Sequence, residues 1–210
     1  MSQDIGDSGP TETWGHWSFR AVFVAFAGTM VAPSSRSDTA VVANLRELCE
    51  ADLPAVEILL ADALGGRRQV RLGEPVDVLD RPGVVACDGP RVVGVATWAA
   101  GDPAELCCLA VAADHRGRGI GGALVEATAA AVGPVGLWLV TTNDNLDALR
   151  VYQRHGFRIE RVVVDGVAHA RRLKPGIPLV GSHGIPLLDE LVLRRPAPAP
   201  DAARGRPRDE

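Results

Sequence analysis

The sequence predicts one α/β domain in which helices flank a central mixed β-sheet. The chain has 210 residues, of which 47% are hydrophobic, so it can bury the core of one ordinary domain. Apolar runs typical of strands alternate along it with segments of helical periodicity. Two of the strand runs are joined by a turn sequence at 88–90, which indicates an antiparallel hairpin within this alternation.

The alternation predicts the element order β-α-β-β-β-α-β-α-β. The first helix has Asp52 as a candidate N-cap, Pro54 in its first turn and Gly65 after its last turn. The other expected helices cover about 119–132 and 145–155, and the expected strands cover 41–45, 84–87, 92–99, 105–111, 135–141 and 157–164. Residues 67–83 fit either a short helix or a short strand.

The two ends of the chain differ in composition from the body, at about 40–195. Residues 1–39 predict a poorly ordered leader, in which Met30 is an alternative start of translation. The apolar run at 21–32 is too short for a membrane span, which takes about 20 residues. Acidic residues precede this run where a signal peptide has basic ones. Residues 196–210 are rich in proline and charge and predict a disordered tail.

Charge and residue usage exclude several functional classes. With 22 basic and 26 acidic residues the net charge is −4, which opposes a role in nucleic-acid binding. Lys174, the only lysine, lies between Leu173 and Pro175, so the chain lacks the Gly-Lys-Ser/Thr of a Walker A loop. The four cysteines lack C-x-x-C spacing, which predicts reduced and mostly buried thiols in a cytoplasmic protein without a metal site.

A glycine- and arginine-rich segment follows the expected strand 105–111 and precedes an alanine-rich helix. The start of a helix offers unpaired N–H groups and the positive end of the helix dipole, both of which favour phosphate. Glycine lets a ligand approach the backbone closely, and arginine adds bidentate contacts. The segment therefore predicts a phosphate-binding loop formed by Arg116, Gly117, Arg118, Gly119, Gly121 and Gly122.

Two phosphate-binding patterns fit these residues, and neither is specific alone. Gly117, Gly119 and Gly122 satisfy the dinucleotide fingerprint G-x-G-x-x-G, whereas Arg116, Gly119 and Gly121 satisfy R-x-x-G-x-G/A, the coenzyme A loop of acetyltransferases. A dinucleotide loop follows its strand almost at once and opens its domain. Here the loop comes late in the domain, which favours the coenzyme A pattern.

A second motif supports the same choice. Residues 145–157 fit N-x-x-A-x-x-x-Y-x-x-x-G-F at all five fixed positions. With both motifs in order, residues 40–164 resemble the GNAT superfamily of N-acetyltransferases. The resemblance implies the GNAT acyl-CoA N-acyltransferase fold and acetyl-CoA as cosubstrate, with a small or peptidic primary amine as acceptor. Residues 171–178 and 184–191, which contain KPGIP and GIPLLDE, also resemble the C-terminal segment of a bacterial GNAT subgroup.

The resemblance implies roles for individual residues. The amides of Gly117 to Gly122 would hold the pyrophosphate of the coenzyme. The amide of Val111 would donate to the thioester carbonyl, and Asn145 would contact the pantetheine arm or its connecting strand. The amine would attack the thioester directly in a ternary complex.

Tyr152 and Glu105 are the implied catalytic residues. Tyr152 would protonate the departing thiolate, because a phenol has a basicity comparable to that of a thiolate. Its alternative role is packing of an ordinary helix aromatic on the core. Glu105 lies on the central strand and would take the proton of the amine, directly or through water. Its alternative is a solvated glutamate at the end of a strand.

We expect a less direct part for other polar residues. His115 is expected to face solvent, and His155 to complement the end of a helix. Arg67, Arg68 and Arg71 are expected to form a solvated basic cluster.

Three other classes stay open: a GNAT module that binds acyl-CoA as a sensor without turnover, an NAD(P)-binding oxidoreductase, and an interaction protein acting through its proline-rich tail. No nucleic-acid or membrane partner is expected, and the sequence leaves open whether the chain is a homodimer.

Overall fold

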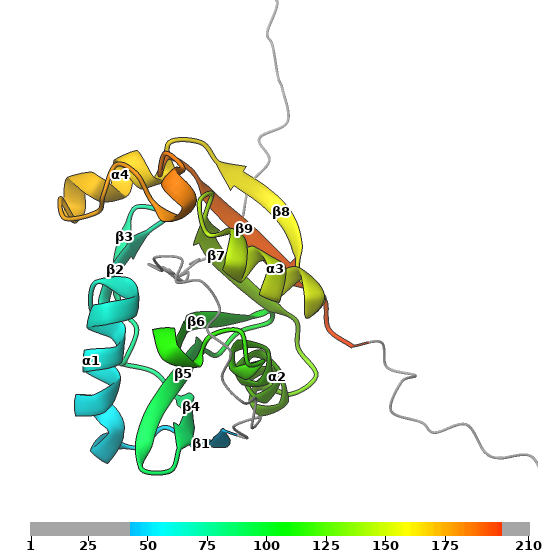
Figure 1. Cartoon of the computed structure of the whole chain (residues 1–210). Helices are drawn as coiled ribbons and strands as arrows, with labels where there is room; N and C mark the ends of the chain where they lie inside the picture. The colour runs from blue at the N-terminus through cyan, green and yellow to red at the C-terminus, as the bar shows by residue number, and fades with distance from the viewer. Residues whose placement is uncertain (1–42, 199–210) are drawn as a thin grey trace, which may run out of the picture.

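The computed structural model describes residues 43–198, which form a seven-stranded mixed sheet beside a two-stranded one (Figure 1). The order in the large sheet is β1-β4-β5-β6-β7-β9-β8, and β2 pairs with β3 in the small one. The strands are β1 (Asn44–Glu47), β2 (Arg68–Arg71), β3 (Glu74–Asp77), β4 (Gly83–Asp88), β5 (Arg91–Ala99), β6 (Ala104–Val111), β7 (Leu137–Thr142), β8 (Arg158–Val163) and β9 (Glu190–Arg195). The expectations for the leader, for Met30 and for most of the tail lie outside the described residues.

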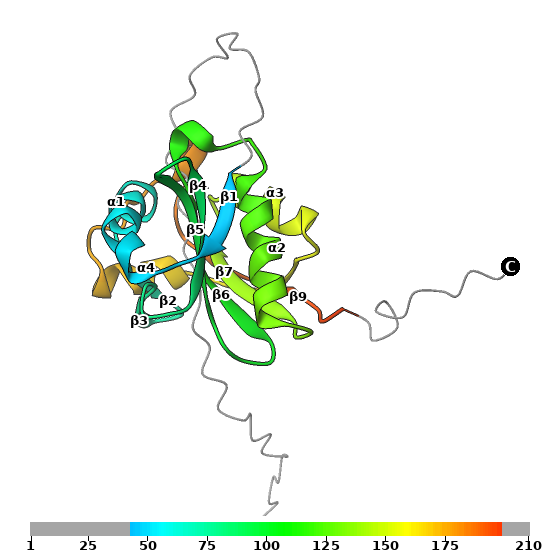
Figure 2. The ribbon, with the colours of Figure 1, turned by 90° about the horizontal axis from the view of Figure 1, so that it is seen from below.

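Helices cover both faces of the large sheet. They are α1 (Leu53–Leu64), α2 (Ile120–Val132), α3 (Leu146–Arg154) and α4 (Gly166–Leu173). Figure 2 shows α1, α4 and the β2–β3 hairpin on one face and α2 and α3 on the other. The predicted fold class is therefore confirmed.

Local sequence signals account for most elements. Helix α1 ends at Gly65, whose φ of 67° is the left-handed geometry that terminates helices. Asp52 precedes α1 but does not cap it, because its carboxylate accepts from Arg46 and from the Cys49 N–H instead. The β4–β5 hairpin turns at Gly89, which also has positive φ. Buried side chains of α1 and α2 pack on β5 and β6 and make one core, in which Leu60, Leu106 and Leu124 are fully buried.

The structure adds three features to the predicted order. The undecided segment 67–83 forms the β2–β3 hairpin. Residues beyond 164 form α4 and β9, and β9 inserts between β7 and β8 with antiparallel pairing to both. These pairings join segments far apart in the chain, so no local pattern indicates them.

The four cysteines are free, and three of them are buried, as expected. No helix within residues 43–198 is long and apolar enough to span a membrane.

The parallel strands β6 and β7 stay together over only two residue pairs. Ala104 pairs with Leu137 and Glu105 with Trp138, after which the ladder ends. The β5–β6 register then shifts so that Cys107 has no partner on β5. Because a β-bulge bends its strand and increases its twist, this bulge accounts for the divergence of β6 from β7.

The KPGIP segment fastens α4 to the β2–β3 hairpin. Lys174 Nζ lies 3.0 Å from the carbonyl oxygen of Arg68 and 3.4 Å from that of Gly65. It is also 3.4 Å from Gln69 Oε1. Burial lowers the pKa of the ammonium group from its ordinary value. The only lysine of the chain thus joins two segments more than 100 residues apart.

We expect Lys174→Ala to lower the free energy of unfolding by about 1 kcal/mol, because charge-assisted hydrogen bonds to the hairpin are lost. Urea denaturation measures the change. Arg172→Ala, at an exposed position near the end of the same helix, is the matched control and should leave stability unchanged. Equal effects of both substitutions would contradict the anchoring role.

Candidate functional site

Backbone amides of β6 are directed toward the diverging strand β7. The Ala112 N–H donates to the Val93 carbonyl on β5 at 2.8 Å. In an antiparallel ladder hydrogen-bonded and non-hydrogen-bonded pairs alternate, so the neighbouring pair Val111–Gly94 is non-hydrogen-bonded. The N–H of Val111 therefore points away from β5. The same alternation directs the N–H of Leu109 to that side.

The glycine-rich loop connects the end of β6 to α2. Gly117 and Gly119 have φ of 76° and 83°, which side chains rarely tolerate, and α2 begins at Ile120. The amides of the first helical turn have no acceptor within the helix. They provide the donors and the dipole that the sequence predicted for phosphate.

A pocket of about 330 Å³ lies between this loop and α3. Its lining includes Val111, so the pocket reaches the point where the β6 amides face the divergence. The other lining residues are His115, Arg116, Gly117, Gly119, Ile120, Gly121, Gly122, Asp147, Arg150, Val151, Arg154 and His155. Of the predicted loop residues, only Arg118 is not part of the lining.

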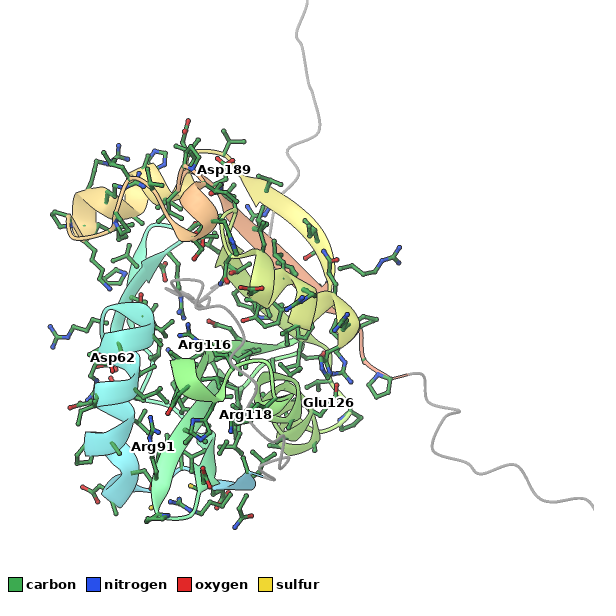
Figure 3. The ribbon with its side chains drawn as sticks, in the orientation of Figure 1. Asp62, Arg91, Arg116, Arg118, Glu126 and Asp189 are labelled. Carbon is green, nitrogen blue, oxygen red and sulfur yellow. The ribbon has the colours of Figure 1, made fainter. Side chains whose placement is uncertain are left out.

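The two predicted loop arginines differ in their surroundings (Figure 3). Arg116 is partly buried, and its Nε donates to the Val111 carbonyl at 3.1 Å. Burial lowers the pKa of this guanidinium, opposed by the charge of Asp147. Arg118 is exposed. Arg116 is therefore the better placed of the two for a ligand in the pocket.

Gly121 and Gly122 differ in what an added side chain would meet. A Cβ on Gly122 would lie 2.4 Å from His155 Nε2, so any side chain there would have to displace the His155 ring. The imidazole is held in place by Nδ1, 2.8 Å from Glu126 Oε1. A Cβ on Gly121 would meet nothing closer than 3.9 Å. Packing within the protein therefore leaves Gly121 free to vary.

Tyr152 and Asn145 are buried and keep polar atoms without partners. The Tyr152 side chain is fully buried, packs edge-on against Phe157 and has a hydroxyl with no hydrogen-bond partner in the described part of the chain. Burial raises its pKa well above the ordinary value, and nearby Cys108 adds to the rise. Asn145 Nδ2 donates to Thr141 Oγ1 at 3.0 Å, whereas its Oδ1 has no partner within residues 43–198. Buried polar atoms are rarely left unpaired, which suggests that a ligand contacts them.

Glu105 lies where β6 and β7 separate, and it is buried. Its Oε1 is 3.1 Å from Nη2 of Arg71, and Nη1 of Arg71 donates to the Cys107 carbonyl at 3.3 Å. The alternative of a solvated strand-end glutamate is therefore wrong. Arg71 comes from the hairpin on the α1 face, whereas Tyr152 belongs to α3 on the opposite face (Figure 2).

Two other expectations are corrected. His115 is buried rather than solvent-facing, because it lies 3.1 Å from Asp88 and 2.9 Å from Asp114. Arg71 is fully buried and paired rather than part of a solvated cluster. Arg67 contacts three acidic residues, Glu57, Asp77 and Asp80. The expected role of His155 at the end of α3 agrees with its C-cap position.

Sequence reasoning missed three contributors. Arg150 and Arg154 line the pocket from α3, and their i, i+4 spacing is a signal that could have identified them. The amide of Leu109 faces the divergence, which no residue type could have indicated.

Solved structures share this fold. The structure of a GNAT family acetyltransferase from Elizabethkingia anophelis with acetyl-CoA bound has a TM-score of 0.57 and 20% identity, over 73% of this chain and 97% of that one. A Bacillus subtilis acetyltransferase in complex with CoA has a TM-score of 0.56 and 20% identity, over 74% and 99%. The fold is that of the acetyltransferase class.

Sequence comparison gives the family. The model described as Acetyltransferase (GNAT) family matches residues 57–157. The uncharacterized protein YxbD of Bacillus subtilis (strain 168) is 38% identical over 56% of this chain and 74% of its own length. The mycothiol acetyltransferase of Parafrankia sp. (strain EAN1pec) is 34% identical over 64% of this chain and 44% of its own length. The chain belongs to the acetyltransferase (GNAT) family.

We expect Gly122→Ala to lower the free energy of unfolding by about 1–3 kcal/mol, because the new methyl group overlaps the His155 ring. Thermal and urea unfolding measure this loss. The double variant Gly122→Ala/His155→Ala should recover most of it, whereas Gly121→Ala should cause none. A stable Gly122→Ala protein would show that the ring moves aside freely.

Proposed function

We propose that this protein is an N-acetyltransferase that moves the acetyl group of acetyl-CoA to a primary amine by direct attack in a ternary complex. The observation that carries the proposal is the position of Val111. This residue lines the glycine-loop pocket, and its N–H faces the divergence of β6 from β7. The glycine loop and the outward-facing amides of β6 thus adjoin one pocket, which supports a ligand with phosphates at one end and carbonyl groups along its arm.

The pocket fits the phosphates of the coenzyme. The amides of Gly117 to Gly122 and the guanidinium of Arg116 would hold the pyrophosphate, with Arg150 and Arg154 adding charge from α3. Arg118 is exposed and does not line the pocket, so it would contact the phosphates from the solvent side. The unpartnered Oδ1 of Asn145 would accept a hydrogen bond from the pantetheine arm. Acetyl-CoA is bound in one of the structures that share the fold, which supports this choice.

Carbonyl stabilisation would come from the backbone of β6. As the amine attacks, the C–N bond forms and the carbonyl oxygen gains negative charge. Fixed N–H donors lower the energy of such a transition state. We assign this role to the amide of Val111 and add that of Leu109, which points the same way.

The departing thiolate needs a proton when the C–S bond breaks. Tyr152 would supply it, because burial keeps the phenol protonated and leaves its hydroxyl without a protein partner.

Glu105 would receive the proton that the amine loses, directly or through water. It reaches the site from the face opposite α3, so acid and base would flank the thioester. The ion pair with Arg71 holds the carboxylate at the start of the divergence. We also propose a cytoplasmic location, which the free cysteines support.

We expect Gly121→Val to weaken acetyl-CoA binding at least tenfold without unfolding the protein, because its side chain would enter the space proposed for phosphate. Isothermal titration calorimetry measures the affinity. Gly176→Val is the control, since a Cβ there also meets open space but lies outside the pocket lining. Unchanged affinity of the Gly121 variant would overturn the proposed coenzyme site.

We expect Tyr152→Phe to lower kcat about a hundredfold, with acetyl-CoA affinity unchanged. Stability should stay equal or rise, because the lost hydroxyl has no partner in the described residues. Release of coenzyme A, calorimetry and urea denaturation measure the three quantities. A kcat of the variant within threefold of the parent value would show that Tyr152 packs in the core and does not act as the general acid. Absence of turnover in the parent with every amine would favour the acyl-CoA sensor.

A further inference from the structure

Arg81, in the loop between β3 and β4, is a cation that has no partner among the described residues. It is partly buried, its Nε is fully enclosed, and its side chain makes no hydrogen bond or ion pair within residues 43–198. A buried polar nitrogen without an acceptor costs free energy. A side chain of this kind points to an acceptor outside residues 43–198.

The backbone places Arg81 beside the proposed reaction site. The next residue, Pro82, accepts a hydrogen bond from the Trp98 N–H at 3.1 Å. Trp98 pairs with Leu106, the neighbour of Glu105 on β6. The charge of Arg81 also acts on the Arg71 guanidinium and on the Cys107 thiol. Arg81 therefore lies on the Glu105 side of the divergence.

The carboxylates near Arg71 and Arg81 leave part of the donor capacity of both guanidinium groups unused. Arg71 is fully buried and pairs with Glu105, but its Nε also lacks an acceptor within the described residues. The other buried carboxylate, Glu190, accepts the Leu72 N–H at 2.9 Å and packs against Gly166. The charge of Arg71 also acts on Glu190. Arg71 thus faces two carboxylates, whereas Arg81 has no hydrogen bond or ion pair within residues 43–198, and both arginines retain an unused Nε donor.

We propose that Arg81 and Arg71 bind a carboxylate of the acceptor, so that the substrate class is a small amine carrying a carboxylate, as in an α-amino acid. This inference rests on the proposed function and specifies its acceptor. The planar guanidinium fork matches a carboxylate. In an α-amino acid the nitrogen lies two bonds from the carboxylate carbon, which suits the closeness of Glu105 to Arg71. The amine would face Glu105 while the carboxylate faces Arg81.

Steady-state kinetics with matched acceptors test the proposal. Phenylalanine and leucine are each compared with their amides and with 2-phenylethylamine and 3-methylbutylamine, which lack the carboxylate. We expect kcat/KM for the amino acids to exceed that for the uncharged analogues at least tenfold. We expect Arg81→Gln to lower the amino-acid value about tenfold and leave the analogues unchanged, while Arg81→Lys keeps part of the preference.

Controls separate this role from a structural one. Arg158→Gln removes an exposed arginine from the edge strand β8 and should change none of the values. Calorimetric titration of each amino acid in the presence of coenzyme A should show the same tenfold loss in the Arg81→Gln protein, and the KM for acetyl-CoA should stay constant.

The outcomes distinguish the two proposals. Turnover of the amides and simple amines as fast as the amino acids, or an equal loss for all acceptors in Arg81→Gln, overturns the carboxylate site and leaves the acetyltransferase intact. Absence of acetyl-CoA-dependent turnover with every amine overturns the proposed function, and the acceptor inference falls with it.

Discussion

The separation of β6 from β7 is the constraint on which the candidate site depends. Two parallel strands ordinarily satisfy each other's amides along their whole length. Here the pairing ends after Glu105, and a bulge at Cys107 turns β6 away. The amides of Leu109 and Val111 are thereby left facing the opened side instead of a neighbouring strand. The sheet gives up part of its hydrogen bonding at one place, where a carbonyl-bearing ligand can restore it.

Chain segments on opposite faces of the sheet complete the site from two directions. Helices α2 and α3, with the glycine loop, supply the pocket proposed for phosphate and the Tyr152 hydroxyl. The β2–β3 hairpin on the other face supplies Arg71, which pairs with Glu105 inside the protein. The hairpin is itself held by the C-terminal segment through Lys174 and Glu190. The C-terminal segment, which has no proposed chemistry, thus fixes the position of a buried ion pair next to the proposed reaction site.

Sequence reasoning went furthest where the signal was local. The helix ending at Gly65, the β4–β5 hairpin and the glycine loop all follow from turn and cap chemistry within a few residues. It failed for Arg71 and His115, which were expected in solvent, because burial of a charged side chain depends on partners distant in the chain. It also could not separate Gly121 from Gly122. The two are adjacent glycines in one motif, and only the His155 ring above Gly122 distinguishes them.

The sequence by itself determined the α/β class, the glycine-rich loop proposed to bind phosphate and the family resemblance, since these depend on residue types at fixed short spacings. The tertiary structure decided the rest. It inserted β9 between β7 and β8 and placed α3, which carries Tyr152, and the hairpin that pairs with Glu105 on opposite faces of the sheet. It also brought Arg81 within electrostatic reach of Arg71. The physical reason is that each of these arrangements depends on strand pairing or burial between segments tens of residues apart, and residue order does not specify such pairings.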